Sequence, residues 1–156
     1  MDTMLASVIA VLGTLAGAAV SGLLQHRAAR MERVSARSEQ QRRDQMNAVT
    51  ALAVALSDHR RAMWEVRDAD LTGQSAQRIQ ELRDESHRTR SAITDPAVRL
   101  RLLISDGTVR TAAAAATTAT YVMRDAVDLA ELQAMRRSAL ESHDAFVNTA
   151  GAFLGA

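Results

Sequence analysis

One segment of the sequence contains the residue types of a calcium-binding loop. Asp68, Asp70 and Gly73 match the first, third and sixth positions of a loop that binds Ca²⁺ through oxygen atoms. The fifth position offers only Thr72, and the twelfth, where a bidentate Glu is the principal ligand, is Ile79. The segment therefore predicts a helix end and a hairpin turn, with Gly73 in the left-handed conformation of a C-terminal cap.

Two histidines fall on otherwise apolar helical faces. His59 and His143 could meet in the core, with Asp58 or Asp144 as orienting carboxylates, and bind a metal or titrate near neutral pH. Neither has a second His or Cys three or four residues away, and two ligands alone do not complete a site. We therefore favour histidines that are satisfied by hydrogen bonds in the core, and we predict no metal site.

Motifs of enzymes are missing from the chain. Because there is no Cys, disulfides, thiol nucleophiles and thiolate metal sites are excluded. No Gly-x-Ser-x-Gly elbow, Walker loop or dinucleotide fingerprint occurs. The four aromatic residues are too scattered for the base-stacking platform of a single-strand binder. We expect a protein without catalytic residues or cofactors.

The first apolar run determines whether the N-terminal helix lies in a membrane or in water. From Met4 to Leu24 there is no charge and no Pro, and at about 1.5 Å per residue a helix of this length covers a hydrocarbon core of roughly 30 Å. We predict a transmembrane helix over residues 1–25. The only charge before the run is Asp2, whereas a cleaved secretory signal carries Lys or Arg there, so we expect the helix to remain in the mature protein.

A belt of arginines follows this run. Residues 27–43 contain six Arg and two Glu, a local charge of +4 in a chain of net charge +1. Cytoplasmic flanks of membrane helices are enriched in Arg and Lys, which predicts a single pass with the N-terminus outside and the C-terminal domain in the cytoplasm. Anionic lipid is the expected partner of the belt, and nucleic acid is not. The lipid-facing residues are Arg27, Arg30, Arg33 and Arg37.

Small residues line one face of the predicted membrane helix. They follow the Gly-xxx-Gly dimerisation pattern of membrane helices. The residues are Ala10, Gly13, Thr14, Gly17 and Ser21. Self-association through this face is one interpretation, and the other is that Gly and Ala are simply common in such helices.

The remaining chain predicts an all-α fold. Between Leu24 and Leu71 there is neither Pro nor Gly, so the membrane helix should continue through an Arg-rich stalk over residues 26–45. Residues 46–156 should form a small up-down helical bundle with short connections. We expect a helix capped by Ser75, a restart with Asp95 as N-cap, a break at Ser105–Gly107, and a last helix opened by Asp128 and Glu131. The Ala-rich and Thr-rich stretch before that last helix should permit close packing.

One segment of the predicted bundle combines residue types that are enriched at interface hot spots. Trp64, the single Trp of the chain, follows the adjacent Arg60 and Arg61. A partner-binding patch of these three residues is one interpretation. Core packing of Trp64 is the alternative.

Three stretches of the chain carry a family resemblance, and they are Leu12–Arg30, the Asp58–Trp64 segment, and Ser86–Ala92 leading into Pro96. With these stretches the chain resembles the KilB family of actinomycete plasmid and chromosome proteins. The resemblance covers nearly the whole chain and implies a membrane-associated protein that is linked to conjugative plasmid transfer, particularly to spread within the recipient mycelium. It implies no catalytic residue.

We therefore expect a non-enzymatic, membrane-anchored interaction protein that recruits other membrane or transfer-complex proteins. A membrane-bound regulatory or sensory module is the first alternative, because a continuous helix could transmit a change across the bilayer. A membrane-perturbing oligomer is the second.

Overall fold

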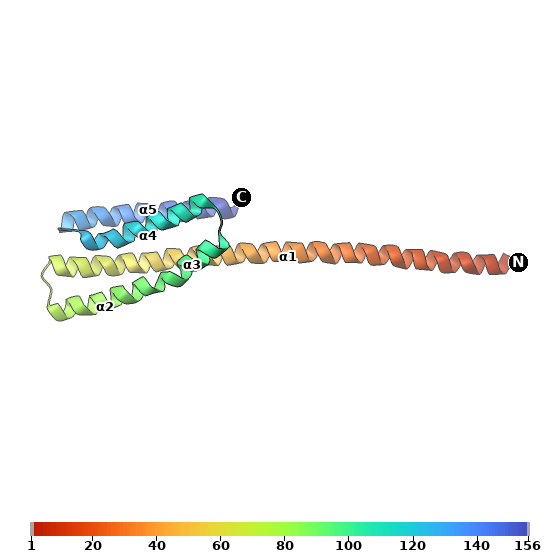
Figure 1. Ribbon diagram of the computed structural model, residues 1–156, viewed down its shortest axis with the longest axis horizontal. Coiled ribbons are helices and arrows are strands. Elements are labelled where there is room, and N and C mark those ends of the chain that lie inside the picture. Colours follow the sequence, from red (N-terminus) through yellow and green to blue (C-terminus); the bar gives the residue numbers. More distant parts are fainter. Residues whose placement is uncertain (1, 156) are drawn as a thin grey trace. The chain divides into compact units, whose positions relative to one another are not determined.

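The computed structural model describes the backbone of residues 2–155 and the side chains of residues 30–155, and it is helical throughout (Figure 1). Within these residues there is no strand, so the all-α prediction is confirmed. The helices are α1 (Asp2–Leu71), α2 (Ala76–Ala92), α3 (Thr94–Leu103), α4 (Gly107–Val122), the 3₁₀ turn η1 (Met123–Asp125) and α5 (Leu129–Gly155). The chain divides into two units, residues 1–41 and 42–156.

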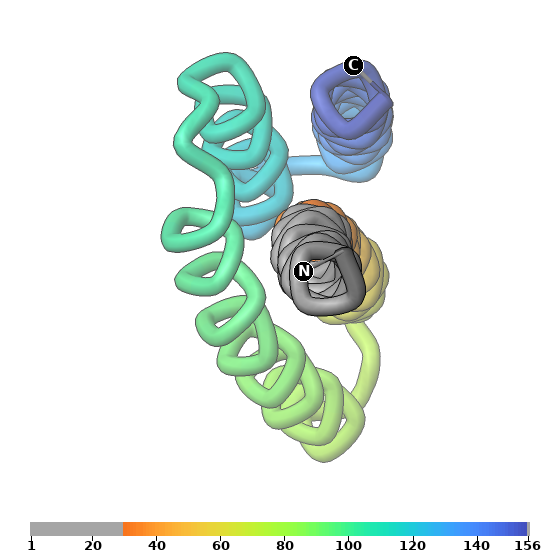
Figure 2. The backbone as a smooth tube through the Cα atoms, turned by 90° about the vertical axis from the view of Figure 1, so that its right-hand side faces the viewer, coloured from red at the N-terminus to blue at the C-terminus, as the bar shows by residue number. Residues whose placement is uncertain are grey.

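The second unit is a four-helix bundle in which consecutive legs run antiparallel (Figure 1). Its legs are the end of α1, the pair α2 and α3, then α4, and finally α5. Figure 2 shows α2 and α3 following one another as a single curved leg beside α1. Short connections enforce this up-down order, as the sequence predicted.

The turn between α1 and α2 follows the predicted helix end. Gly73 has φ +70°, and its N–H donates to the Asp70 carbonyl at 3.3 Å. The N–H of Gln74 donates to the Ala69 carbonyl at 2.9 Å, which completes a Schellman cap. The hydroxyl of Ser75 then accepts from the Arg78 N–H at 3.3 Å and caps α2. A helix cap and a hairpin turn thus occupy the segment that resembles a calcium loop.

The break inside the curved leg differs from the prediction. Asp95 was expected to cap α3, yet α3 begins at Thr94 and its N-cap is Ile93, which has no side-chain cap. Ile93 is buried and keeps nearly helical dihedrals (φ −73°, ψ −28°), so the chain hardly leaves the helix between α2 and α3. Pro96 lies inside the first turn, where its missing N–H leaves no bond unmade.

Helices α4 and α5 pack closely against one another. Their buried faces contain Ala113 and Ala116 on α4 and Ala139 and Ala150 on α5, which allows the backbones to come near each other. Close packing of the Ala-rich stretch is therefore confirmed. The predicted break at Ser105–Gly107 is present, and the side chain of Asp106 there accepts from two N–H groups at the start of α4. The predicted opening of the last helix is confirmed, because the side chain of Asp128 accepts from the Glu131 N–H at 2.8 Å.

Two clusters of buried side chains hold the bundle together. We call the first the large core, and it draws on α1, α3, α4 and α5; its largest members are Leu52, Leu56, Leu100, Ile104, Val109 and Phe146. The second, the small core, lies toward the α1–α2 turn and consists of Met63, Met123, Ala126, Leu132 and Ala139. The N–H of the Arg67 guanidinium donates to the Ala126 carbonyl at 2.6 Å and ties α1 to this end.

Some large apolar residues of the bundle are exposed. On α5, the exposed fractions of Leu129 and Leu140 are 42% and 37%. Leu102 is 80% exposed within the most apolar short stretch of the bundle. The buried face of α5 is formed instead by Leu132, Ala139, Phe146 and Ala150.

In the first unit, the described side chains are those of residues 30–41, and all of them are exposed. Among the residues searched for membrane spans, which are the described ones, no helix is long and apolar enough to cross a bilayer. The predicted transmembrane segment lies over residues 1–25, whose side chains are outside the described part of the chain. That segment and the stalk up to residue 45 therefore stay predictions.

Candidate partner-binding surface on α1 and α5

Trp64 lies half-buried on α1, with one side of its ring against the small core. From the neighbouring helix α5, the guanidinium of Arg136 lies over the ring at 4.8 Å from its centroid. This cation–π contact fixes a cationic group over the indole face. Trp64 therefore packs against the bundle, and its binding to a partner stays a prediction.

Arg60 precedes Trp64 by one helical turn and has an incomplete set of hydrogen bonds. One terminal nitrogen, Nη2, donates to the Ser57 hydroxyl at 3.1 Å. The other, Nη1, is buried and has no hydrogen-bond partner among the described residues. A buried charged donor without an acceptor is unfavourable and rare in native proteins. This donor is the most unusual polar group of the bundle.

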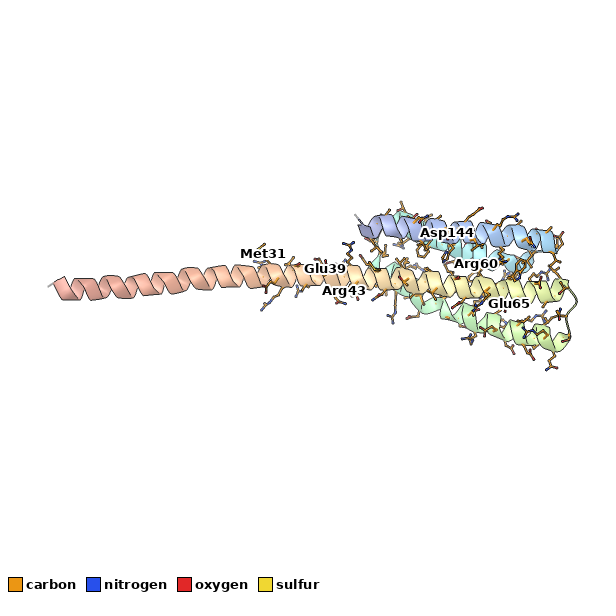
Figure 3. All side chains as sticks on the ribbon, turned by 180° about the vertical axis from the view of Figure 1, so that it is seen from behind. Met31, Glu39, Arg43, Arg60, Glu65 and Asp144 are labelled. Atoms are coloured by element: carbon orange, nitrogen blue, oxygen red, sulfur yellow. The ribbon has the colours of Figure 1, made fainter. Side chains whose placement is uncertain are left out.

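The charges around Arg60 come from α5. Burial lowers the pKa of Arg60, the positive charge of Arg136 lowers it further, and Asp144 acts in the opposite direction. Arg60 belongs to α1 and Asp144 to α5, as the labelled side chains of Figure 3 show. We call Arg60, Trp64, Arg136 and Asp144 the Trp64 surface.

Two of the three residues of the predicted patch, Arg60 and Trp64, lie in the Trp64 surface, and their binding role stays a prediction. Arg61 instead pairs with Asp58 at 3.7 Å, and its side chain is 72% exposed. Arg136 and Asp144 were missed. They are eight residues apart, so they share one face of a helix, which is a visible signal. That this face meets α1 depends on the topology of the bundle, which the sequence does not state.

The two histidines do not form a common site. Nδ1 of His59 lies 3.0 Å from the Thr89 hydroxyl, and its ring meets the Tyr121 ring edge-on at 5.4 Å. Nε2 of His143 lies 3.1 Å from the Ala53 carbonyl oxygen. Each is thus a hydrogen-bonded histidine in its own surroundings. Within the described residues, no group of three or more potential ligands could hold a metal ion.

The lipid-facing belt is only partly described. Arg30, Arg33 and Arg37 are exposed, and no ion pair between described residues includes them. Arg27 lies outside the residues whose side chains are described. The same holds for the small-residue face, which consists of Ala10, Gly13, Thr14, Gly17 and Ser21.

The geometry thus defines an all-α bundle with a polar, arginine-rich surface beside its single Trp. The profile of the KilB plasmid transfer protein family matches residues 46–154, which is most of the chain. The chain is also 44% identical over 153 residues to the protein KilB of Streptomyces lividans, covering 98% of this chain and 100% of that relative. The chain therefore belongs to the KilB plasmid transfer protein family, and the resemblance found in the sequence is confirmed. No solved structure matches the chain significantly.

Proposed function

We propose that this protein is a non-enzymatic, membrane-anchored accessory of conjugative plasmid transfer, acting in spread of the plasmid within the recipient mycelium. Membership of the plasmid transfer family supports the process. The Trp64 surface supports a role in binding another protein of the transfer complex. The observation that carries this role is the buried Nη1 of Arg60, which has no acceptor among the described residues.

The chemistry of the Trp64 surface indicates what the partner supplies. Trp and Arg are the residue types most enriched at interface hot spots. A carboxylate of the partner that reaches Arg60 would form a charge-assisted hydrogen bond and balance the nearby Arg136. An acidic side chain beside an apolar group is therefore the expected complement of this surface.

Two substitutions test this role. Arg60→Gln shortens the side chain and removes the guanidinium with its unpaired donor, so the free energy of unfolding should stay within about 1 kcal/mol of the parent while plasmid spread is lost. Arg61→Gln is the matched control, because Arg61 is exposed and only pairs with Asp58, and it should spread normally. Thermal unfolding of each full-length variant is measured beside plasmid spread. Normal spread of Arg60→Gln would refute the role of the surface.

Trp64→Ala separates packing from binding. If Trp64 mainly fills the small core, its truncation should cost about 3–5 kcal/mol and unfold much of the protein at growth temperature. The binding role instead predicts that the variant unfolds at nearly the same temperature as the parent but no longer supports plasmid spread. A variant that is already unfolded would remove the reason to single out Trp64.

Membrane anchoring belongs to the same proposal, with the N-terminus outside and the bundle in the cytoplasm. Its support is the uncharged run from Met4 to Leu24, followed by the arginine belt. With single cysteines at Thr3 or Gly155, a membrane-impermeant thiol reagent on intact cells should label only the first. Labelling at Gly155 alone would overturn the topology and the lipid-belt hypothesis with it.

Self-association through the small-residue face is part of the proposal as well. Gly17→Ile should clash at a close helix contact and weaken a membrane dimer in a crosslinking assay. Leu15→Ile and Leu23→Ile should change little. Equal behaviour of all three variants would mean that the face reflects composition alone.

A further inference from the structure

A cleft opens between α1, α2 and the end of α4, on the stripe of α1 next to the Trp64 surface. Its volume is about 280 Å³. Apolar side chains of α1, Met63 and Val66, form part of its wall, and Tyr121 contributes a ring. The dimensions suit a small organic molecule better than a peptide segment.

The charged side chains that line the cleft are all positive. Three arginines line it, Arg83 and Arg90 from α2 and Arg124 from η1, and its lining contains no Asp or Glu. Arg124 pairs with the neighbouring Asp125 at 3.3 Å. Among the described residues, no ion pair includes Arg83 or Arg90. Two guanidinium groups thus remain without a counter-charge at one cavity.

The wall behind these arginines is held by specific contacts. Arg90 lies over the Tyr121 ring at 5.0 Å from its centroid. That ring meets the ring of His59 edge-on at an interplanar angle of 79°. His59 also belongs to the lining of the cleft, and it is buried and hydrogen-bonded to Thr89, so it supports Tyr121. Arg90 is therefore positioned before any ligand arrives, which lowers the entropy lost on binding.

Uncompensated guanidinium groups that face one cavity favour a ligand with more than one negative charge. A guanidinium presents its N–H groups as a planar fork that matches the oxygens of phosphate. We propose that this cleft binds the phosphate group of a small phosphorylated molecule, with Arg83 and Arg90 forming the ion pairs and Met63 and Val66 contacting its organic part. This inference is independent of the proposed function and concerns a different surface.

Titration calorimetry on the full-length protein in a neutral detergent tests this site. The probes are inorganic phosphate, adenosine monophosphate and dihexanoyl phosphatidic acid, all at one fixed ionic strength. Binding of at least one probe is expected. The probe that binds most tightly identifies the source of the phosphate group, which is the free ion, a nucleotide or a lipid headgroup.

Variants show whether the bound probe is in the cleft. Arg83→Gln and Arg90→Gln should each weaken binding about tenfold or more, because each removes a charge-assisted hydrogen bond. Arg101→Gln is the control, since Arg101 is exposed on α3 and outside the cleft. Arg83 has no hydrogen bond or ion pair with another described residue, so its variant should fold like the parent. Failure of all three probes to bind, or equal losses with Arg101→Gln, would overturn the proposal.

Discussion

The two ends of the bundle differ in what their side chains do. The large core is built from alanines together with branched and aromatic apolar residues, which come from every leg of the bundle. The small core contains two methionines and three smaller or branched residues, and half-buried Trp64 packs against it. Both the Trp64 surface and the arginine-lined cleft adjoin the small core. The comparison agrees with our proposals, in which one end provides stability and the other provides recognition.

The largest effect should come from emptying the large core. Phe146 is fully buried, so Phe146→Ala should lower the free energy of unfolding by about 3–5 kcal/mol. Val147→Ala, at the exposed neighbouring position, should lose at most about 1 kcal/mol. Urea unfolding measures both. A loss below about 1 kcal/mol for Phe146→Ala would contradict the assignment of stability to this end.

Acid should destabilise the bundle through His59, which lies beside the small core. Burial first, and the charge of Arg90 second, lower the pKa of His59 from 6.5 to about 4. Between these values the unfolded chain binds more protons, so stability should fall as the pH drops from 6.5 toward 4, by up to about 3 kcal/mol. His59→Gln should remove this part of the pH dependence. Chemical denaturation of both proteins at pH 7 and pH 4.5 measures the difference, and identical pH slopes would refute the assignment.

Replacing Gly73, which terminates α1, and Gly151, which lies inside α5, by Ala should change the free energy of unfolding in opposite directions. Gly73 has φ +70° and open space around it, so Gly73→Ala should cost about 1–2 kcal/mol through backbone strain alone. Gly151 lies in α5 beside the large core, also with open space, so Gly151→Ala should stabilise by roughly 0.5–1 kcal/mol. Thermal unfolding compares the two. If both variants change the thermal stability in the same direction, backbone strain at Gly73 does not determine the stability of the α1–α2 turn.

The smallest effect on stability should come from Arg136. Arg136→Gln removes a cation–π contact worth about 0.5–1 kcal/mol, but it also relieves the repulsion with Arg60, so the net change should stay within about 1 kcal/mol. Plasmid spread should nevertheless fall, because the surface loses a charge. Unfolding followed by Trp64 fluorescence measures the first quantity. A large loss of stability with normal spread would make Arg136 a structural residue only.

How much of this could be predicted from the sequence depends on the range of the interactions. The caps at Gly73, Ser75 and Asp128 use residues within a few positions of one another, and their prediction was confirmed. The start of α3 was wrong, because a strong local signal at Asp95–Pro96 lost to the burial of Ile93. The partners of Trp64 and Arg60 come from α5, more than 70 residues later in the chain, and only the tertiary packing shows which faces meet.

The close pairing of α4 and α5 has a consequence for the order in which the protein folds. The two helices are joined by the short segment from Met123 to Asp128, so closing this hairpin restricts little chain. Contacts between residues near in sequence form fastest. The α4–α5 hairpin should therefore assemble early, and its docking onto α1 should follow. In that order Trp64, the single fluorophore of its kind in the chain, reports the late step and not the early one.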